Sequence, residues 1–70
     1  MKSEETFGKR LKMLRKEKVL TQKQLAEAVH LDATTITKYE TEKIGPSIPM
    51  IKVFKEFFNV SADFMLGWED

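Results

Sequence analysis

The sequence predicts an all-α fold, a single bundle of five short helices. Apolar residues recur at helical spacing over most of the chain. Side chains that cap helices, such as Ser, Thr and Asp, stand directly before these stretches. No stretch shows the alternation of a strand, an internal repeat or low complexity. With 70 residues, we expect one domain over residues 1–70 whose core is small.

The first helix is expected from Glu4 to Lys18. Ser3 can cap it, and acidic residues in its first turn suit the positive end of the helix dipole. Its apolar stripe consists of Phe7, Leu11 and Leu14, and its basic side consists of Lys9, Lys12 and Lys16.

The second helix is expected to begin at Thr21 and to end near Val29. The run Thr21-Gln22-Lys23-Gln24 fits a capping box, in which the hydroxyl accepts a hydrogen bond from the third residue's N–H and Gln24 reaches back. Its buried stripe consists of Leu25, Ala26 and Val29.

The third helix is expected to begin at Asp32, which can cap it, and to run to Glu40. Ile36 and Tyr39 point inward on this pattern. The opposite face consists of Ala33, Thr34, Thr37 and Lys38. Threonines weaken a helix, so their place on an exposed face suggests that another molecule approaches it closely.

A loop from Thr41 to Pro46 follows, and its Gly45-Pro46 pair breaks the helix. The fourth helix begins at Ser47 and ends at Asn59-Val60. Ser61 caps a last short helix over Ala62–Leu66, which Gly67 stops.

Charge is distributed unevenly, although the net charge is only +1. Residues 9–23 hold seven basic side chains and one acid, whereas residues 56–70 hold four acids and no base. This asymmetry suggests one surface for a polyanion and another that faces away from it. A solvated helix with ordinary lysines is the alternative.

Several kinds of function are excluded by residues that the chain lacks. The absence of cysteine excludes disulfides, thiolate metal sites and a thiol nucleophile. The single histidine, His30, excludes a histidine metal cluster, and no acid pair, nucleophile or phosphate loop has spacing that an enzyme could use. No cofactor, metal or small-molecule ligand is therefore expected. The longest apolar run, Phe64–Leu66, cannot span a membrane and no signal peptide precedes the fold, so we expect a cytoplasmic protein.

The second and third helices, joined by a tight turn, form a helix-turn-helix unit. The chain's third helix protrudes from this unit and fits the major groove of DNA. The diagnostic stretches are LRKEK at 14–18, LTQKQLAE at 20–27, ITKYE at 36–40, Pro46-Ser47 and Asn59-Val60-Ser61. In these stretches the chain resembles the Cro/repressor-type, lambda-repressor-like helix-turn-helix family of bacterial and phage regulators. The resemblance covers residues 7–67 and implies a compact five-helix DNA-binding domain.

The resemblance implies that the third helix lies in the major groove of an operator. The residues that would face the bases and the nearby backbone are Ala33, Thr34, Thr37 and Lys38. Gln22, at the start of the second helix, and Lys43, in the loop after the third, match positions that contact phosphate. The alternative for each is an ordinary surface residue.

The resemblance also implies a structural ion pair and a dimer. Arg15 and Glu40 match a partly buried pair that joins the first helix to the end of the third. Members of the family pair through their last helices as two-fold dimers. An apolar patch near the C-terminus therefore predicts a homodimer that uses some of its residues, unless they fill the core: Phe57, Phe64, Met65 and Trp68.

The chain departs from the family pattern at its turns and at one cap. Glycine is usual where this chain has Val19, His30 and Glu42, at sites that often need a positive φ. Either the first helix ends differently or Val19 is strained, because a β-branched residue adopts such a φ poorly. Asp32 replaces the usual Ser or Thr cap, and its charge would repel a phosphate, so no DNA contact is assigned to it.

The expected function is that of a transcriptional regulator which binds double-stranded DNA sequence-specifically and acts as a repressor. Its affinity should fall steeply with salt. Two alternatives remain open. One is a protein-interaction module such as an antitoxin or adaptor, and the other is the N-terminal DNA-binding domain of a longer repressor.

Overall fold

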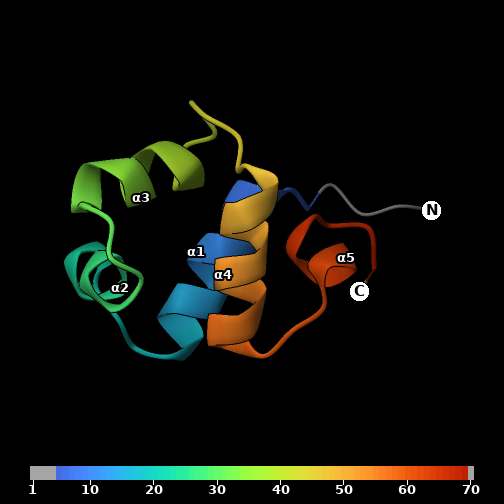
Figure 1. Ribbon diagram of the computed structural model, residues 1–70, viewed down its shortest axis with the longest axis horizontal. Coiled ribbons are helices and arrows are strands. Elements are labelled where there is room, and N and C mark those ends of the chain that lie inside the picture. Colours follow the sequence, from blue (N-terminus) through green and yellow to red (C-terminus); the bar gives the residue numbers. More distant parts are fainter. Residues whose placement is uncertain (1–4, 70) are drawn as a thin grey trace.

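Five helices make up the fold of the computed structural model, which describes residues 5–69. They are α1 (Phe7–Glu17), α2 (Gln22–Ala28), α3 (Ala33–Glu40), α4 (Ile48–Phe58) and α5 (Ala62–Met65). Figure 1 shows α2 and α3 together at one end of the long axis, α4 in front of α1 in the middle, and α5 at the other end. The all-α prediction is confirmed over this part of the chain, and none of the helices described there is long and apolar enough to cross a membrane.

The start of α1 differs from the sequence-based prediction. Thr6, with an extended backbone, is the N-cap, and its hydroxyl accepts a hydrogen bond from the N–H of Lys9 at 3.3 Å. Glu5 precedes the helix, and the expected cap Ser3 and start Glu4 lie outside the described residues. The helix begins after this threonine because the threonine side chain accepts a hydrogen bond from a backbone N–H that has no partner within the first turn.

The other caps agree with the sequence-based predictions. Thr21 and Gln24 form both bonds of the capping box, at 3.0 and 2.9 Å. Ser47 and Ser61 cap α4 and α5, and Pro at the start of α4 costs no hydrogen bond. The fold thus begins four helices at the residues that the sequence marks.

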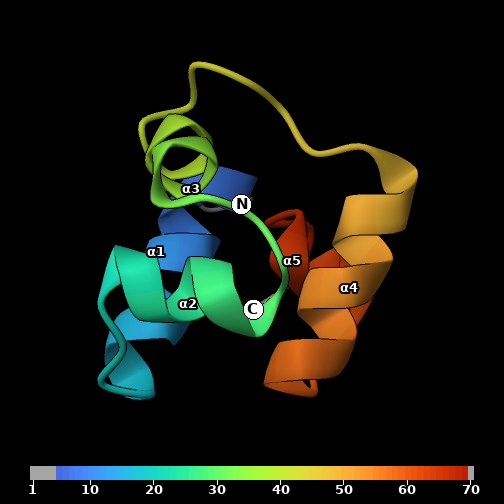
Figure 2. The ribbon, with the colours of Figure 1, turned by 60° about the vertical axis from the view of Figure 1, so that its left-hand side comes forward.

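The core lies where the apolar stripes of the helices meet. Its completely buried side chains are Leu11, Leu25, Ile36, Phe54 and Met65. Three rings join α1, α3 and α4, since Phe7, Tyr39 and Phe54 have centroids 5.5–5.8 Å apart, two of the three pairs edge to face. Figure 2 shows from a second angle that α4 lies across the core from α2.

Several turns adopt a left-handed backbone without glycine. Val19, His30 and Glu42 have φ values of 58°, 63° and 65°. The sequence left open whether the first helix ends differently or Val19 is strained. Because α1 ends at Glu17 and Val19 keeps a positive φ, this β-branched residue is strained. Its side chain is 86% exposed, so no packing compensates for the strain.

Candidate nucleic-acid interface

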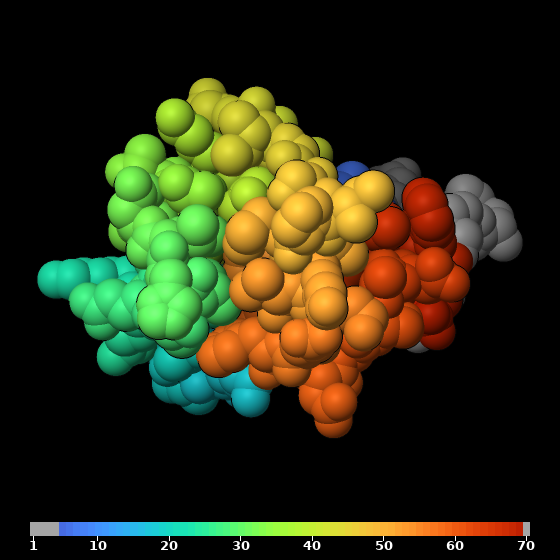
Figure 3. Space-filling model, viewed as in Figure 1, coloured from blue at the N-terminus to red at the C-terminus, as the bar shows by residue number. Residues whose placement is uncertain are grey.

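The outer face of α3 is exposed and polar. Ile36 and Tyr39 are buried against the core, which turns the opposite side of α3 outward. Thr34 and Lys38 are exposed there, and Ala33 and Thr37 are half-buried. Figure 3 shows α3 and the loop after it at the surface, forming one edge of the molecule. All four residues predicted for this helix therefore lie on one accessible side.

The cap of α3 holds a fixed negative charge. One carboxylate oxygen of Asp32 accepts hydrogen bonds from the backbone N–H and the hydroxyl of Thr35, both at 2.9 Å. These bonds, together with the charge of Lys38, lower the pKa of Asp32 below its ordinary value. The predicted capping role is confirmed, and the side chain is exposed and ionised at neutral pH.

A buried ion pair joins α1 to the end of α3, as predicted. The guanidinium of Arg15 donates to both oxygens of Glu40, at 2.6 and 3.0 Å. A third bond from Arg15 reaches the carbonyl of Leu20 at 2.8 Å, in the turn before α2. Because both side chains are almost fully buried, this pair ties α1, α3 and the turn before α2 together in one geometry.

Gln22 extends this polar network, a role that the sequence did not predict. Its amide nitrogen donates to Glu40 at 3.0 Å, and its amide oxygen accepts from the Thr37 hydroxyl at 2.7 Å. Gln22 is half-buried between α2 and α3. We call the four side chains the junction network: Arg15, Glu40, Gln22 and Thr37. The sequence could not reveal this role, because both partners lie on α3, 15 and 18 residues further along the chain.

The loop after α3 holds Lys43, which is exposed as expected for a phosphate contact. Its backbone N–H donates to the carbonyl of Lys38 at 2.9 Å, so the loop folds back on the end of α3. Thr41 is exposed beside Lys43, and the sequence-based prediction did not include it among the candidate DNA contacts. Its hydroxyl donates to the Thr37 carbonyl at 2.8 Å. Thr41 lies one turn beyond Thr37, so helical spacing alone could have found it.

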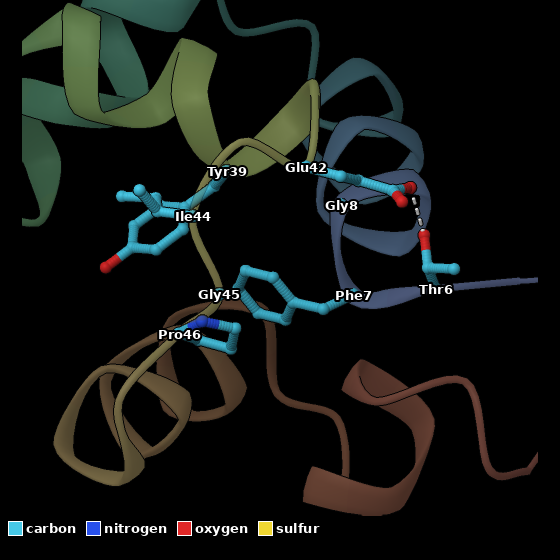
Figure 4. Close-up of a pocket in the computed structure, with 8 residues that line it drawn as sticks. All are labelled: Thr6, Phe7, Gly8, Tyr39, Glu42, Ile44, Gly45 and Pro46. Carbon is cyan, nitrogen blue, oxygen red and sulfur yellow. Dashed lines mark hydrogen bonds between the residues drawn. The ribbon is translucent and has the colours of Figure 1, made fainter.

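A small cavity of about 190 Å³ opens between this loop and the start of α1. Figure 4 shows Phe7, Tyr39, Ile44 and Pro46 along it, and Thr6 bonded to Glu42 at its edge. Mostly apolar walls and this size do not suit a metal or cofactor. No group of three metal-ligating side chains occurs among residues 5–69.

The expected dimer residues fall into three environments, and one expectation is wrong. Met65 is completely buried in the core and has no surface left for a partner. Phe64 is half-buried with the Arg10 guanidinium 4.1 Å above its ring, and Phe57 packs edge to face on Phe58. Trp68 is 65% exposed. The sequence-based prediction included Met65 because it lies in an apolar cluster near the C-terminus, and for this residue the alternative holds, that it fills the core.

Comparison with known proteins agrees with this geometry. Residues 8–66 match the family described as helix-turn-helix domain. The chain is 39% identical over 64 residues to the HTH-type transcriptional activator BcrR of Enterococcus faecalis, covering 91% of this chain and 31% of that protein. It is 31% identical over 64 residues to the immunity repressor protein of Bacillus phage phi105, covering 91% of this chain and 44% of that one. The chain thus spans about a third to about half of the length of these relatives.

The fold is also that of solved crystal structures, among them the following two. One is the P22 c2 repressor protein in complex with a synthetic operator, with a TM-score of 0.84, 20% identity and coverage of 93% of this chain and 98% of that one. The other is a transcriptional regulator from Listeria innocua, with a TM-score of 0.84, 26% identity and coverage of 93% and 61%. The lambda-repressor-like fold prediction is confirmed.

Proposed function

The chain belongs to the Cro/repressor-type helix-turn-helix family, and from that premise we propose that it is a transcriptional regulator that binds double-stranded DNA sequence-specifically. The observation that carries the proposal is the outer face of α3, where Thr34 and Lys38 are exposed and the helix lies at an edge of the molecule. An α-helix presented in this way fits the major groove. The solved P22 c2 repressor complex, which contains a synthetic operator, supports the same choice of ligand.

In the proposed complex, α3 lies in the major groove and α2 crosses the backbone. Ala33, Thr34, Thr37 and Lys38 face the bases and the adjacent backbone. Gln22 and Lys43 contact phosphate, Gln22 with the amide N–H that it does not give to Glu40. The lysines on the exposed side of α1 add long-range attraction for the polyanion. The protein acts as a repressor by excluding polymerase from the operator.

The direct test is selection of bound sequences from random duplex DNA, repeated with Lys38→Ala and Thr34→Ala. We expect an enriched motif, a loss of about 1–3 kcal/mol at one base position where Lys38 reads a base, and affinity that falls steeply with salt. A uniform loss would assign Lys38 to phosphate instead, and the absence of any motif would overturn the function. A reporter gene placed behind the promoter and operator shows whether the protein represses or activates transcription, since repression lowers the reporter's output.

We further propose that the chain is one DNA-binding domain, residues 1–70, that acts as a two-fold dimer in the cytoplasm. Trp68, Phe57 and Phe64 are the candidate contacts, with Val53, 37% exposed and one turn before Phe57, as an addition. Two such domains would place their recognition helices about 34 Å apart, one turn of DNA. Sedimentation at concentrations up to high micromolar should show a dimer that Trp68→Ala weakens, and a monomer throughout would remove this part.

A further inference from the structure

The junction network fixes the direction of each hydrogen bond along it. Arg15 donates to both oxygens of Glu40, and a carboxylate can only accept. The amide of Gln22 must therefore turn its nitrogen toward Glu40, at 3.0 Å, and its oxygen toward Thr37. A flipped amide would place its oxygen against the carboxylate, so the orientation follows from the chemistry of the partners.

This orientation determines where the single hydroxyl proton of Thr37 points. The hydroxyl oxygen lies 2.7 Å from the Gln22 amide oxygen and 3.1 Å from the backbone carbonyl of Ala33. Both neighbours can only accept, so the proton is directed into the protein whichever one receives it. The Thr37 side chain is half-buried, and toward solvent it presents lone pairs and no proton.

We propose, building on the DNA-binding function above, that Thr37 reads a base pair as a hydrogen-bond acceptor only, and that the rest of the junction network sets this polarity. In the major groove, adenine and cytosine present an amino group where thymine and guanine present a carbonyl oxygen. Thr37 accordingly selects A or C on one strand. A threonine with an unrestrained hydroxyl bonds to either class of base, so the network supplies the selectivity.

Thr34 provides the contrast on the same helix. Its side chain is exposed, and its hydroxyl makes no hydrogen bond to any residue from 5 to 69. Such a hydroxyl can turn to donate or to accept. The two threonines have the same side chain but should differ in the bases that they select, and only the selectivity of Thr37 depends on Gln22.

The test begins with selection of bound duplexes for the whole chain and for Thr37→Val and Thr37→Ser. The base pair whose preference weakens in T37V, and is kept in T37S, is the one that Thr37 reads. In the unsubstituted protein this position should accept both A and C on one strand. Inverting the pair, which exchanges amino and carbonyl groups between the strands, should weaken binding about fivefold or more.

The positioning role of Gln22 is tested with Gln22→Leu. This change removes the closer of the two acceptors of the Thr37 proton and leaves only the longer bond to the Ala33 carbonyl at 3.1 Å. The hydroxyl is then held less firmly, so the penalty for inverting the pair should fall clearly below that of the unsubstituted protein, even if overall affinity drops. The loss should disappear in a T37V background, where no hydroxyl remains to be directed. Gln24→Leu is the matched control, the same chemical change on the same helix outside the junction network, and should keep the inversion penalty.

Three results would overturn the inference while leaving the proposed function standing. A preference for thymine that T37V retains would mean that the threonine methyl group makes the contact. A uniform loss of affinity in T37V would assign the hydroxyl to phosphate. An inversion penalty unchanged by Q22L would show that Gln22 does not set the polarity. If instead the unsubstituted protein selects no motif, it is the proposed function that fails.

Discussion

The two ends of the molecule are held together by different forces. Where α1, α2 and α3 meet, the junction network and a close backbone approach set the geometry with directional contacts. Around α4 and α5, aromatic and aliphatic packing predominates, as in the Phe57–Phe58 contact and the buried Met65. Directional bonds fix orientation more tightly than apolar contacts do. The end that we propose to read DNA is thus the one with fixed orientation, and the other is adaptable.

The largest expected effect comes from breaking the ion pair of the junction. Glu40→Ala leaves the buried Arg15 charge without its carboxylate and should lower the free energy of unfolding by about 3 kcal/mol or more. Urea denaturation measures it. The double variant R15M/E40L removes both charges and should recover most of the loss. If E40A alone unfolds like the unsubstituted protein, the junction does not depend on this pair.

The close backbone approach gives the next effect. A Cβ atom at Gly8 of α1 would lie 2.5 Å from the Tyr39 carbonyl oxygen and 2.8 Å from Cγ of Glu42. Gly8→Ala should therefore separate α1 from α3 and destabilise the protein by about 2 kcal/mol, with weaker DNA binding in the folded fraction. Gly45→Ala is the control, because a Cβ there meets nothing within 4 Å. Equal melting temperatures for the two variants would refute the contact.

The end formed by α4 and α5 should tolerate a change in side-chain shape better than the junction does. Phe54 is completely buried between α1, α3 and α4. Phe54→Leu keeps an apolar side chain there, and we expect a loss of about 1 kcal/mol, since neighbours can repack. The selected DNA motif should not change, which selection on random duplexes measures. A shifted motif would mean that packing, too, orients α3.

The smallest effects concern pH, and both arise at α3, one from its N-cap and one from its buried tyrosine. The lowered pKa of Asp32 means that its cap contributes stability above the unfolded value near 3.9, and that this contribution is lost as the pH falls through the folded value. Burial raises the pKa of Tyr39 above 10.0, so its contribution is present below that pH and is lost as the pH rises through the folded value. Thermal melts of D32N should lack the acid change, and those of Y39F the alkaline one. Unaltered pH profiles in both variants would contradict these assignments.

The sequence predicted the five helices and the caps of α2 to α5 because these depend on neighbours in the chain, whereas α1 is capped by Thr6 and not by the expected Ser3. Apolar spacing located the core residues Leu11, Leu25 and Ile36, and the capping box at Thr21 was present as expected. The burial of Met65 and the internal bonds of Gln22 escaped prediction, since both depend on partners that only the folded chain brings near. The pair of Arg15 and Glu40 was found through a family resemblance rather than through local pattern.

The strained turn at Val19 was anticipated only as one of two alternatives. A missing glycine shows that a turn is unusual, but not whether the backbone or the helix end changes. The structure keeps the turn and places a valine in the left-handed region. Local sequence rules could not choose between these outcomes, because the choice depends on contacts of the folded chain, such as the bond from Arg15 to the Leu20 carbonyl across this turn.

The most direct test of the central claim is an NMR titration of the protein with a duplex obtained by selection. We predict that the largest backbone amide shifts fall on residues 33–38 of α3, at the start of α2 and in the loop at Lys43, that α4 stays nearly unchanged, and that the shifts saturate. Shifts centred on α4 and α5 with α3 unaffected, or shifts that are equal for any duplex, would contradict the account.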